Sequence, residues 1–208
     1  MVDGETLKNV EPSFYALHMI GGKPLQFMGD NVHVMLRTSH GVMVWPRGSE
    51  TTFESAGNPI EIPGRKNAIA YEADYKDNQK WKHFILIAGE KGPEFDDVLG
   101  PTFDSSGHHC LYLADIGNKT YVVHNGTQHL LFDFANLDIS RVHLLFTPEE
   151  YQIKRKSKTK GEEDQLIASI LWPPVFEVSS GRAFFALWSL EGDSVKVSRL
   201  VLNINQEK

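Results

Sequence analysis

The sequence predicts an all-β fold, and three observations support that prediction. The apolar runs are short and rich in β-branched and aromatic residues, as in strands. Gly, Pro, Asn and Asp separate these runs at close intervals, as turns between strands require. Helical periodicity of any length is absent, and Glu149 to Gln152 or Glu162 to Ile167 could form a single helical turn at most.

Six strands are predicted in the first third of the chain. Each is a short apolar or alternating run, and Ser39-His40-Gly41 is a hairpin signal between the third and the fourth. The predicted strands lie near Phe14 to Ile20, Pro24 to Met28, Val32 to Arg37, Gly41 to Trp45, Thr51 to Glu54 and Ile60 to Ile62.

The middle of the chain contains five more predicted strands. Gly117-Asn118 and Asn125-Gly126 indicate tight hairpins, because both central residues of such a turn need positive φ. The strands lie near Ala68 to Ala73, His83 to Ala88, Cys110 to Ala114, Thr120 to His124 and His129 to Phe134.

The last third contains the remaining five. Glu191-Gly192-Asp193 is the hairpin signal between its final two strands. They lie near Val142 to Phe146, Tyr151 to Lys154, Leu166 to Leu171, Ala183 to Leu190 and Ser194 to Asn203.

The strands recur in an internal repeat with a period near 40 residues. Both Pro59 to Val98 and Pro101 to Phe134 contain a strand, a polar hairpin, a second strand ending in Gly and then Phe-Asp. A third copy starts at Pro174, and a weaker one includes Val42 to Glu54. Periods of this length with about four strands each are typical of propeller blades.

The repeat resembles the TolB-like and WD-type β-propeller families, most clearly over residues 59–134. Pro101-Thr-Phe-Asp-Ser-Ser-Gly-His-His-Cys-Leu-Tyr-Leu-Ala is similar to the strand that opens their repeats. Gly89-Glu-Lys-Gly-Pro-Glu-Phe-Asp-Asp-Val is similar to a turn of bacterial members. The resemblance implies sheets stacked radially around a channel, usually as a binding platform.

The predicted architecture is therefore one propeller-like domain over residues 1–208, with about five four-stranded blades. Blade cores are expected near 31–55, 59–98, 101–134 and 140–172. In the fifth, residues 174–204 would pair with the N-terminal strands at 13–28 and so close the ring. An antiparallel sandwich or jelly roll would use the same strands. Residues 1–12 are expected to be a disordered tail, and 155–165 a solvated loop.

Composition limits the function. The net charge of −6 argues against a nucleic-acid partner, because neutralising phosphates needs a basic face. The single cysteine, Cys110, cannot form an internal disulfide and is expected in the core. Neither a signal peptide nor a membrane-spanning apolar run is recognisable, so a cytoplasmic location without a membrane partner is expected. The oligomeric state is left open.

The residues that carry chemistry indicate no catalytic site, metal or cofactor. Adjacent strand residues point to opposite faces, so His108 and His109 cannot chelate a metal from a regular strand. Serine-nucleophile and phosphate-loop signatures are absent. The candidate binding residues are aromatics near turns and one arginine: Trp45, Arg47, Trp81 and Trp172. The alternative is that these aromatics fill the interfaces between blades.

A non-enzymatic scaffold that binds a protein or peptide is the function that these observations favour. The alternative is a carbohydrate-binding or carbohydrate-active β domain that uses the tryptophans and loop carboxylates.

Overall fold

The structure is a computed structural model that describes residues 16–17, 26–28, 31–38, 41–45, 53–66, 68–133, 142–146, 150–157, 163–191 and 194–204. Within these ranges the only helical element is a 3-10 turn, η2 (Val178–Ser180), and every other regular element is a strand. The strand pairs formed there are all antiparallel. The prediction of an all-β fold is confirmed.

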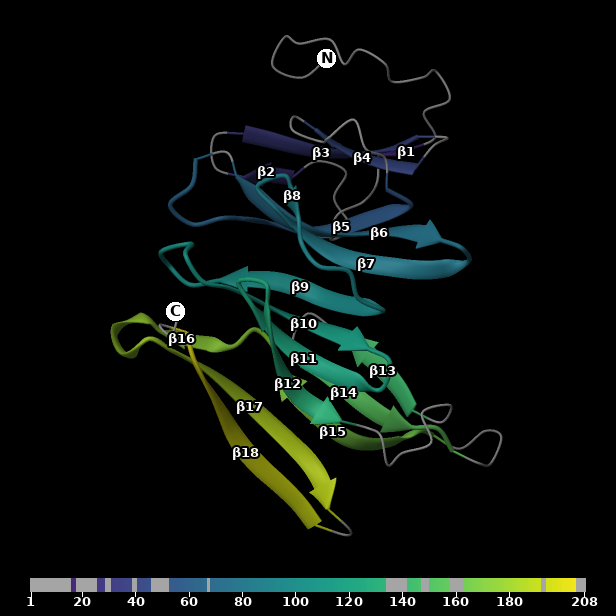
Figure 1. Ribbon diagram of the computed structural model, residues 1–208, viewed down its shortest axis with the longest axis vertical. Helices are drawn as coiled ribbons and strands as arrows, with labels where there is room; N and C mark the ends of the chain where they lie inside the picture. Colours follow the sequence, from purple (N-terminus) through teal and green to yellow (C-terminus); the bar gives the residue numbers. More distant parts are fainter. Residues whose placement is uncertain are drawn as a thin grey trace.

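The described strands form four sheets that follow one another in chain order along the long axis of the molecule (Figure 1). The first sheet contains β1 (Ala16–Leu17), β2 (Gln26–Met28), β3 (Asn31–Thr38) and β4 (Gly41–Trp45). The second contains β5 (Ser55–Glu61), β6 (Ile69–Asp77), β7 (Lys80–Ile87) and β8 (Glu90–Lys91). The third contains β9 (Asp97–Phe103), β10 (Cys110–Ile116), β11 (Lys119–His124) and β12 (Thr127–Asp133).

The fourth sheet is larger than the other three. It contains β13 (Val142–Phe146), β14 (Glu150–Arg155), β15 (Gln165–Leu171), β16 (Val175–Glu177), β17 (Arg182–Glu191) and β18 (Ser194–Asn203). Along one edge β17 pairs with β15 and β16, and along the other with β18. In Figure 1 the β17–β18 hairpin extends beyond the stack at the end opposite the first sheet.

The second and third sheets are meanders, in which each strand pairs with the next along the chain. Their hairpins have the expected backbone. Asn125 and Gly126 both have positive φ, 45° and 86°, which is what the tight-turn prediction required. Asn78 and Gln79 join β6 to β7 in the same way, although no glycine marks that turn in the sequence.

Two prolines that the repeat pattern placed at the start of a unit lie inside strands instead. The register shifts between Gly57 and Ile60, next to Pro59, in β5. It shifts again between Leu99 and Thr102, next to Pro101, in β9. Proline has no N–H to donate, so it is tolerated at an irregularity on an edge strand, and β5 and β9 are edge strands. Each sheet therefore begins about four residues earlier than the prolines suggested.

The core is divided among the interfaces between sheets. On β10, Leu111 and Leu113 belong to a cluster shared with the fourth sheet, which supplies residues such as Ile170. Alternate residues, Cys110 and Tyr112, belong to a cluster shared with the second sheet. β10 is thus buried on both faces, with a two-residue alternation between two cores. A further cluster, including Phe53 and Tyr71, covers the other face of the second sheet.

The second and third sheets also meet closely at their turns. Gly107 follows two serines and has a φ of 71°. A Cβ on Gly107 would lie 2.0 Å from the backbone oxygen of Pro63, so only glycine fits there. Phe103 packs against the cluster that the two sheets share.

The predicted closure of a ring by the two ends of the chain is wrong. Among the described strands, β1 and β2 both pair with β3, whereas β17 pairs with β15, β16 and β18. The first and last sheets lie at opposite ends of the molecule (Figure 1). Short connections explain the difference, because four residues separate β16 from β17 and two separate β17 from β18, and strands close in sequence tend to pair locally.

The expected tail at residues 1–12 lies outside the described residues. The expected loop at 155–165 joins β14 to β15, and its described part includes a hydrogen bond from the Ser157 N–H to Asp164. None of the described elements is a helix of sufficient length and apolarity to cross a membrane.

Candidate functional site

Of the four residues chosen from the sequence, the structure describes the side chains of Trp81 and Trp172, and these two lie apart. Trp81, on β7, is 47% exposed, and its cross-strand partner Lys76 places its ammonium group 5.7 Å from the ring. Trp172 follows β15 and is only 8% exposed, with its ring 6.1 Å from that of Phe185. Trp45 ends β4, but its side chain is outside the description, as is all of Arg47. Trp81 and Trp172 belong to the second and fourth sheets, with the third between them.

Three groups of polar side chains lie between or beside the sheets, and each contains residue types that could carry chemistry. The first is the turn before β10. Asp104 accepts hydrogen bonds from the backbone N–H groups of His108 and His109 and from the hydroxyl of Ser106. Burial alone would raise the pKa of Asp104, but these hydrogen bonds hold it below its usual value. The hydrogen bonds of the Asp104 carboxylate therefore shape the turn, which accounts for this residue without a catalytic role.

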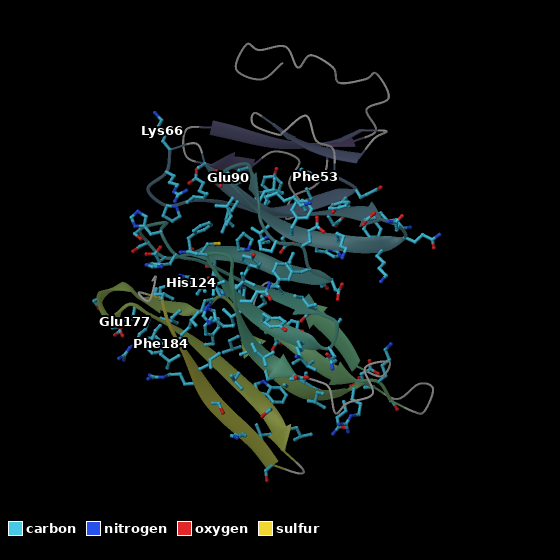
Figure 2. All side chains as sticks on the ribbon, viewed as in Figure 1. Phe53, Lys66, Glu90, His124, Glu177 and Phe184 are labelled. Atoms are coloured by element: carbon cyan, nitrogen blue, oxygen red, sulfur yellow. The ribbon has the colours of Figure 1, made fainter. Side chains whose placement is uncertain are left out.

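A histidine pair lies beside this turn. His109 Nδ1 is 3.1 Å from His124 Nε2, and the two rings are 5.3 Å apart. His124, labelled in Figure 2, ends β11 and is buried. Either nitrogen can be the donor, so the tautomer of one ring sets that of the other.

The second group lies in the contact between the third and fourth sheets. The hydroxyls of Thr120 and Tyr151 both reach Asp115, at 2.6 Å from Thr120 and 3.1 Å from Tyr151, and they lie 2.9 Å from each other. All three side chains are buried. Burial raises the pKa of Asp115 to about 6, although both hydroxyl hydrogen bonds oppose the shift. This network joins β10 and β11 to β14.

The third group contains Asp74 on β6, His83 on β7 and Asp97 on β9. The imidazole Nδ1 of His83 is 3.9 Å from a carboxylate oxygen of Asp74. Burial raises the pKa of both carboxyls, and the nearby imidazole partly offsets the effect. The contact between His83 and Asp74 lies within the second sheet, and Asp97 approaches it from the third sheet. In the described residues, no group of three or more His, Cys, Asp and Glu side chains is placed to hold a metal ion.

Several of the exposed large apolar side chains of the described residues lie on the fourth sheet. The inward side chains Ala183, Phe185, Leu200 and Leu202 pack into the core shared with the third sheet. Their neighbours in the sequence therefore point to the opposite side, which we call the outer face. The outer face contains Val175, Phe184, Trp188, Leu190, Val195, Val197 and Val201.

These outer-face residues form rows across the strands. Val175, Phe184 and Val201 lie side by side on β16, β17 and β18, and Trp188 lies opposite Val197. In Figure 2 Phe184 lies near Glu177, where β16 pairs with β17. Arg199 stacks on the Phe184 ring, with its guanidinium carbon 4.6 Å from the ring centroid.

Several outer-face side chains are strongly exposed. The exposed fractions are 78% for Val197, 68% for Val175 and 64% for Val195. Isolated exposed valines are common, but a contiguous apolar face with a tryptophan in it marks an interaction surface. The outer face is therefore the candidate functional site.

The sequence contained a signal for this face that our selection of residues missed. Ala183 to Leu190 reads Ala-Phe-Phe-Ala-Leu-Trp-Ser-Leu. Its residues are mostly apolar on both faces of the strand and do not alternate between apolar and polar. A run of this kind is expected where a strand is covered on both sides. Among the described residues no sheet covers the outer face of β17, and Trp188 is on that face.

Comparison of the chain with protein-family models, with curated proteins and with solved structures finds no match.

Proposed function

We propose that the chain is a non-enzymatic binding module, built from propeller-like sheets, that holds a protein partner on its outer face. The observation that carries the proposal is the contrast between the two faces of the β17–β18 hairpin. Phe185 and Leu187 on β17 point into a core, whereas Phe184, Trp188 and Val197 form an apolar surface on the other side. A partner that covers the outer face would supply the layer that each inner sheet receives from its neighbour.

The stacking of the sheets supports the propeller-like part of this proposal. The second and third sheets are four-stranded antiparallel meanders packed face to face, as blades are. A stack of this kind can bind over a broad surface without any catalytic group.

Selection of peptides from a random display library tests the proposal. The selected peptides should bind the wild-type chain and bind the W188A and V197D variants at least tenfold more weakly, because a central aromatic anchor typically contributes more than about 1.4 kcal/mol. W81A is the matched control, since it removes another partly exposed tryptophan from the second sheet. Circular dichroism should show that all three variants are folded.

Two results would contradict the proposal. One is a library that yields no binder, and the other is binding that W81A weakens and W188A does not. A glycan array on the same proteins separates the carbohydrate alternative, for which glycan binding should depend on Trp81.

A further inference from the structure

A hydrogen-bonded pair of histidines, His109 and His124, lies at one end of the contact between the third and fourth sheets. Val122 on β11 packs into the core that these two sheets share, and His124 lies two residues further along the same strand. Strand residues two apart lie on the same face, so His124 also faces the fourth sheet. It is buried, and its Nε2 is 3.1 Å from the Nδ1 of the half-buried His109, in the turn before β10.

The turn that carries His109 is held on two sides. The backbone N–H of Cys110 donates to the side-chain oxygen of Asn125 at 2.9 Å, and the side-chain amide of Asn125 donates to the carbonyl of His108. The backbone N–H of Asn125 donates to the carbonyl of Cys110. On its other side the turn packs against the second sheet, through the close approach at Gly107. Residues 104–109, which we call the connecting turn, therefore join the second sheet to the end of β11.

The number of protons on the histidine pair decides whether its hydrogen bond can form. With no added proton, one ring donates its N–H and the other accepts with its bare nitrogen. With one added proton, the imidazolium donates to the neutral imidazole, and the bond remains. With two added protons, both rings present an N–H at the contact and neither offers an acceptor. Two positive charges would then meet across 3.1 Å and repel each other.

The charged groups around the pair favour one added proton but not two. Asp104, in the connecting turn, is buried, and its carboxylate interacts electrostatically with His109. A single carboxylate can offset one positive charge on the pair, but not both. Other titratable or charged side chains of the connecting turn, of the turn before β6 and of β16 and β17 are exposed to water, which screens them: His108, Arg65, Lys66, Glu177 and Arg182.

We propose that His109 and His124 form an acid-sensitive latch, which stays closed with up to one added proton and opens when a second proton binds. Histidine side chains change their charge between about pH 5 and 8, so the latch responds to mild acid. His124 is fixed at the end of a strand, so His109 is the ring that moves, and the connecting turn detaches from β11. The outer face lies on the opposite side of the fourth sheet, so the latch does not depend on a binding partner there.

Amide hydrogen exchange, measured by NMR at pH 8 and pH 4, tests the latch. After correction for the intrinsic effect of pH on exchange, the protection of the Cys110 and Asn125 amides should be at least tenfold lower at pH 4, because their hydrogen bonds open with the turn. Amides in the middle of β10 should keep their protection. An equal loss along the whole of β10 would mean general unfolding and would contradict the latch.

Two variants remove the second positive charge. In H124Q and in H109Q, an uncharged amide that can both donate and accept replaces one ring, so the Cys110 and Asn125 amides should keep their protection at pH 4 to within about twofold. The use of two positions preserves the test if one variant fails to fold. H108Q is the matched control, because His108 is exposed and adjacent to the pair in sequence, and it should show the same loss as wild type. Asp115 titrates in all four proteins, so the comparison removes its effect.

Ring nitrogen chemical shifts provide a second measurement. His109 and His124 should share a hydrogen bond at pH 8 and lose it at pH 4. The absence of this bond at pH 8, or the same loss of amide protection in H124Q and H109Q as in wild type, would overturn the latch. Neither result would affect the binding proposed for the outer face, which peptide selection tests separately.

Discussion

Asp115 is a carboxyl group held by two hydroxyl groups in the contact between the third and fourth sheets. Its pKa is raised to about 6 because the folded chain removes it from water. In the unfolded chain the pKa of an aspartate is about 3.9. The folded state therefore binds this proton more tightly than the unfolded state does.

Protonation of Asp115 therefore stabilises the folded chain at low pH. The contribution of protonated Asp115 to stability is fully present below about pH 4 and is lost as the pH rises through about 6. Two pKa units correspond to about 3 kcal/mol. In D115N, which cannot ionise, the difference between the free energies of unfolding at pH 4 and pH 7 should change by roughly that amount relative to wild type.

Urea unfolding of both proteins at pH 4, 5, 6 and 7 measures this difference. Comparing the two proteins cancels other titrating groups, such as Asp74 and Asp97, whose pKa values are also raised. Equal pH dependence in wild type and D115N would show that Asp115 is not desolvated as the structure indicates.

Among the strands whose burial the structure describes, β10 is the most completely buried. Leu113 is fully buried in the core shared with the fourth sheet, whereas Leu130, on the edge strand β12 of the same sheet, is 56% exposed. L113A should lower the free energy of unfolding by about 2–5 kcal/mol through lost burial and the cavity that it leaves. L130A should change it by less than about 0.5 kcal/mol.

Thermal and urea unfolding of these two variants provide the measurement, and L130A is the matched control. Similar losses in both variants would mean that the third sheet does not pack against the fourth through β10.

The elements also show what the sequence could predict. Asn125-Gly126 predicts its hairpin correctly because the positive φ of both residues is a local property. Pro59 and Pro101 misplaced two sheet boundaries, because a proline at an irregular edge position and a proline before a strand look alike in sequence. The pairing of β17 with β15 was missed because strand choice depends on contacts between distant residues.

The candidate site was harder to predict than the fold. The sequence analysis chose tryptophans near turns, but Trp172 lies in a core and the outer-face Trp188 lies within a strand. Position along the chain does not tell which face of a strand is covered. That information appears only when the sheets are placed in order.

At the scale of the whole molecule, the stack has an end that its own described sheets do not cover. Replacing Val175, Val195 and Val197 by threonine keeps β-branched side chains on the strands while making the outer face polar. The triple variant V175T/V195T/V197T should unfold with a free energy within about 0.5 kcal/mol per substitution of wild type, because these side chains are already in water. It should also bind less of a fluorescent dye that reports exposed apolar surface.

V122T is the matched control, because Val122 on β11 is only 1% exposed and belongs to the core between the third and fourth sheets. A hydroxyl buried there without a designed partner should cost about 1–3 kcal/mol. Urea unfolding and dye titration on the same samples distinguish the two cases. If the triple variant lost as much stability per substitution as V122T, the outer face would be covered within the folded chain, and a partner could not use it as a docking surface.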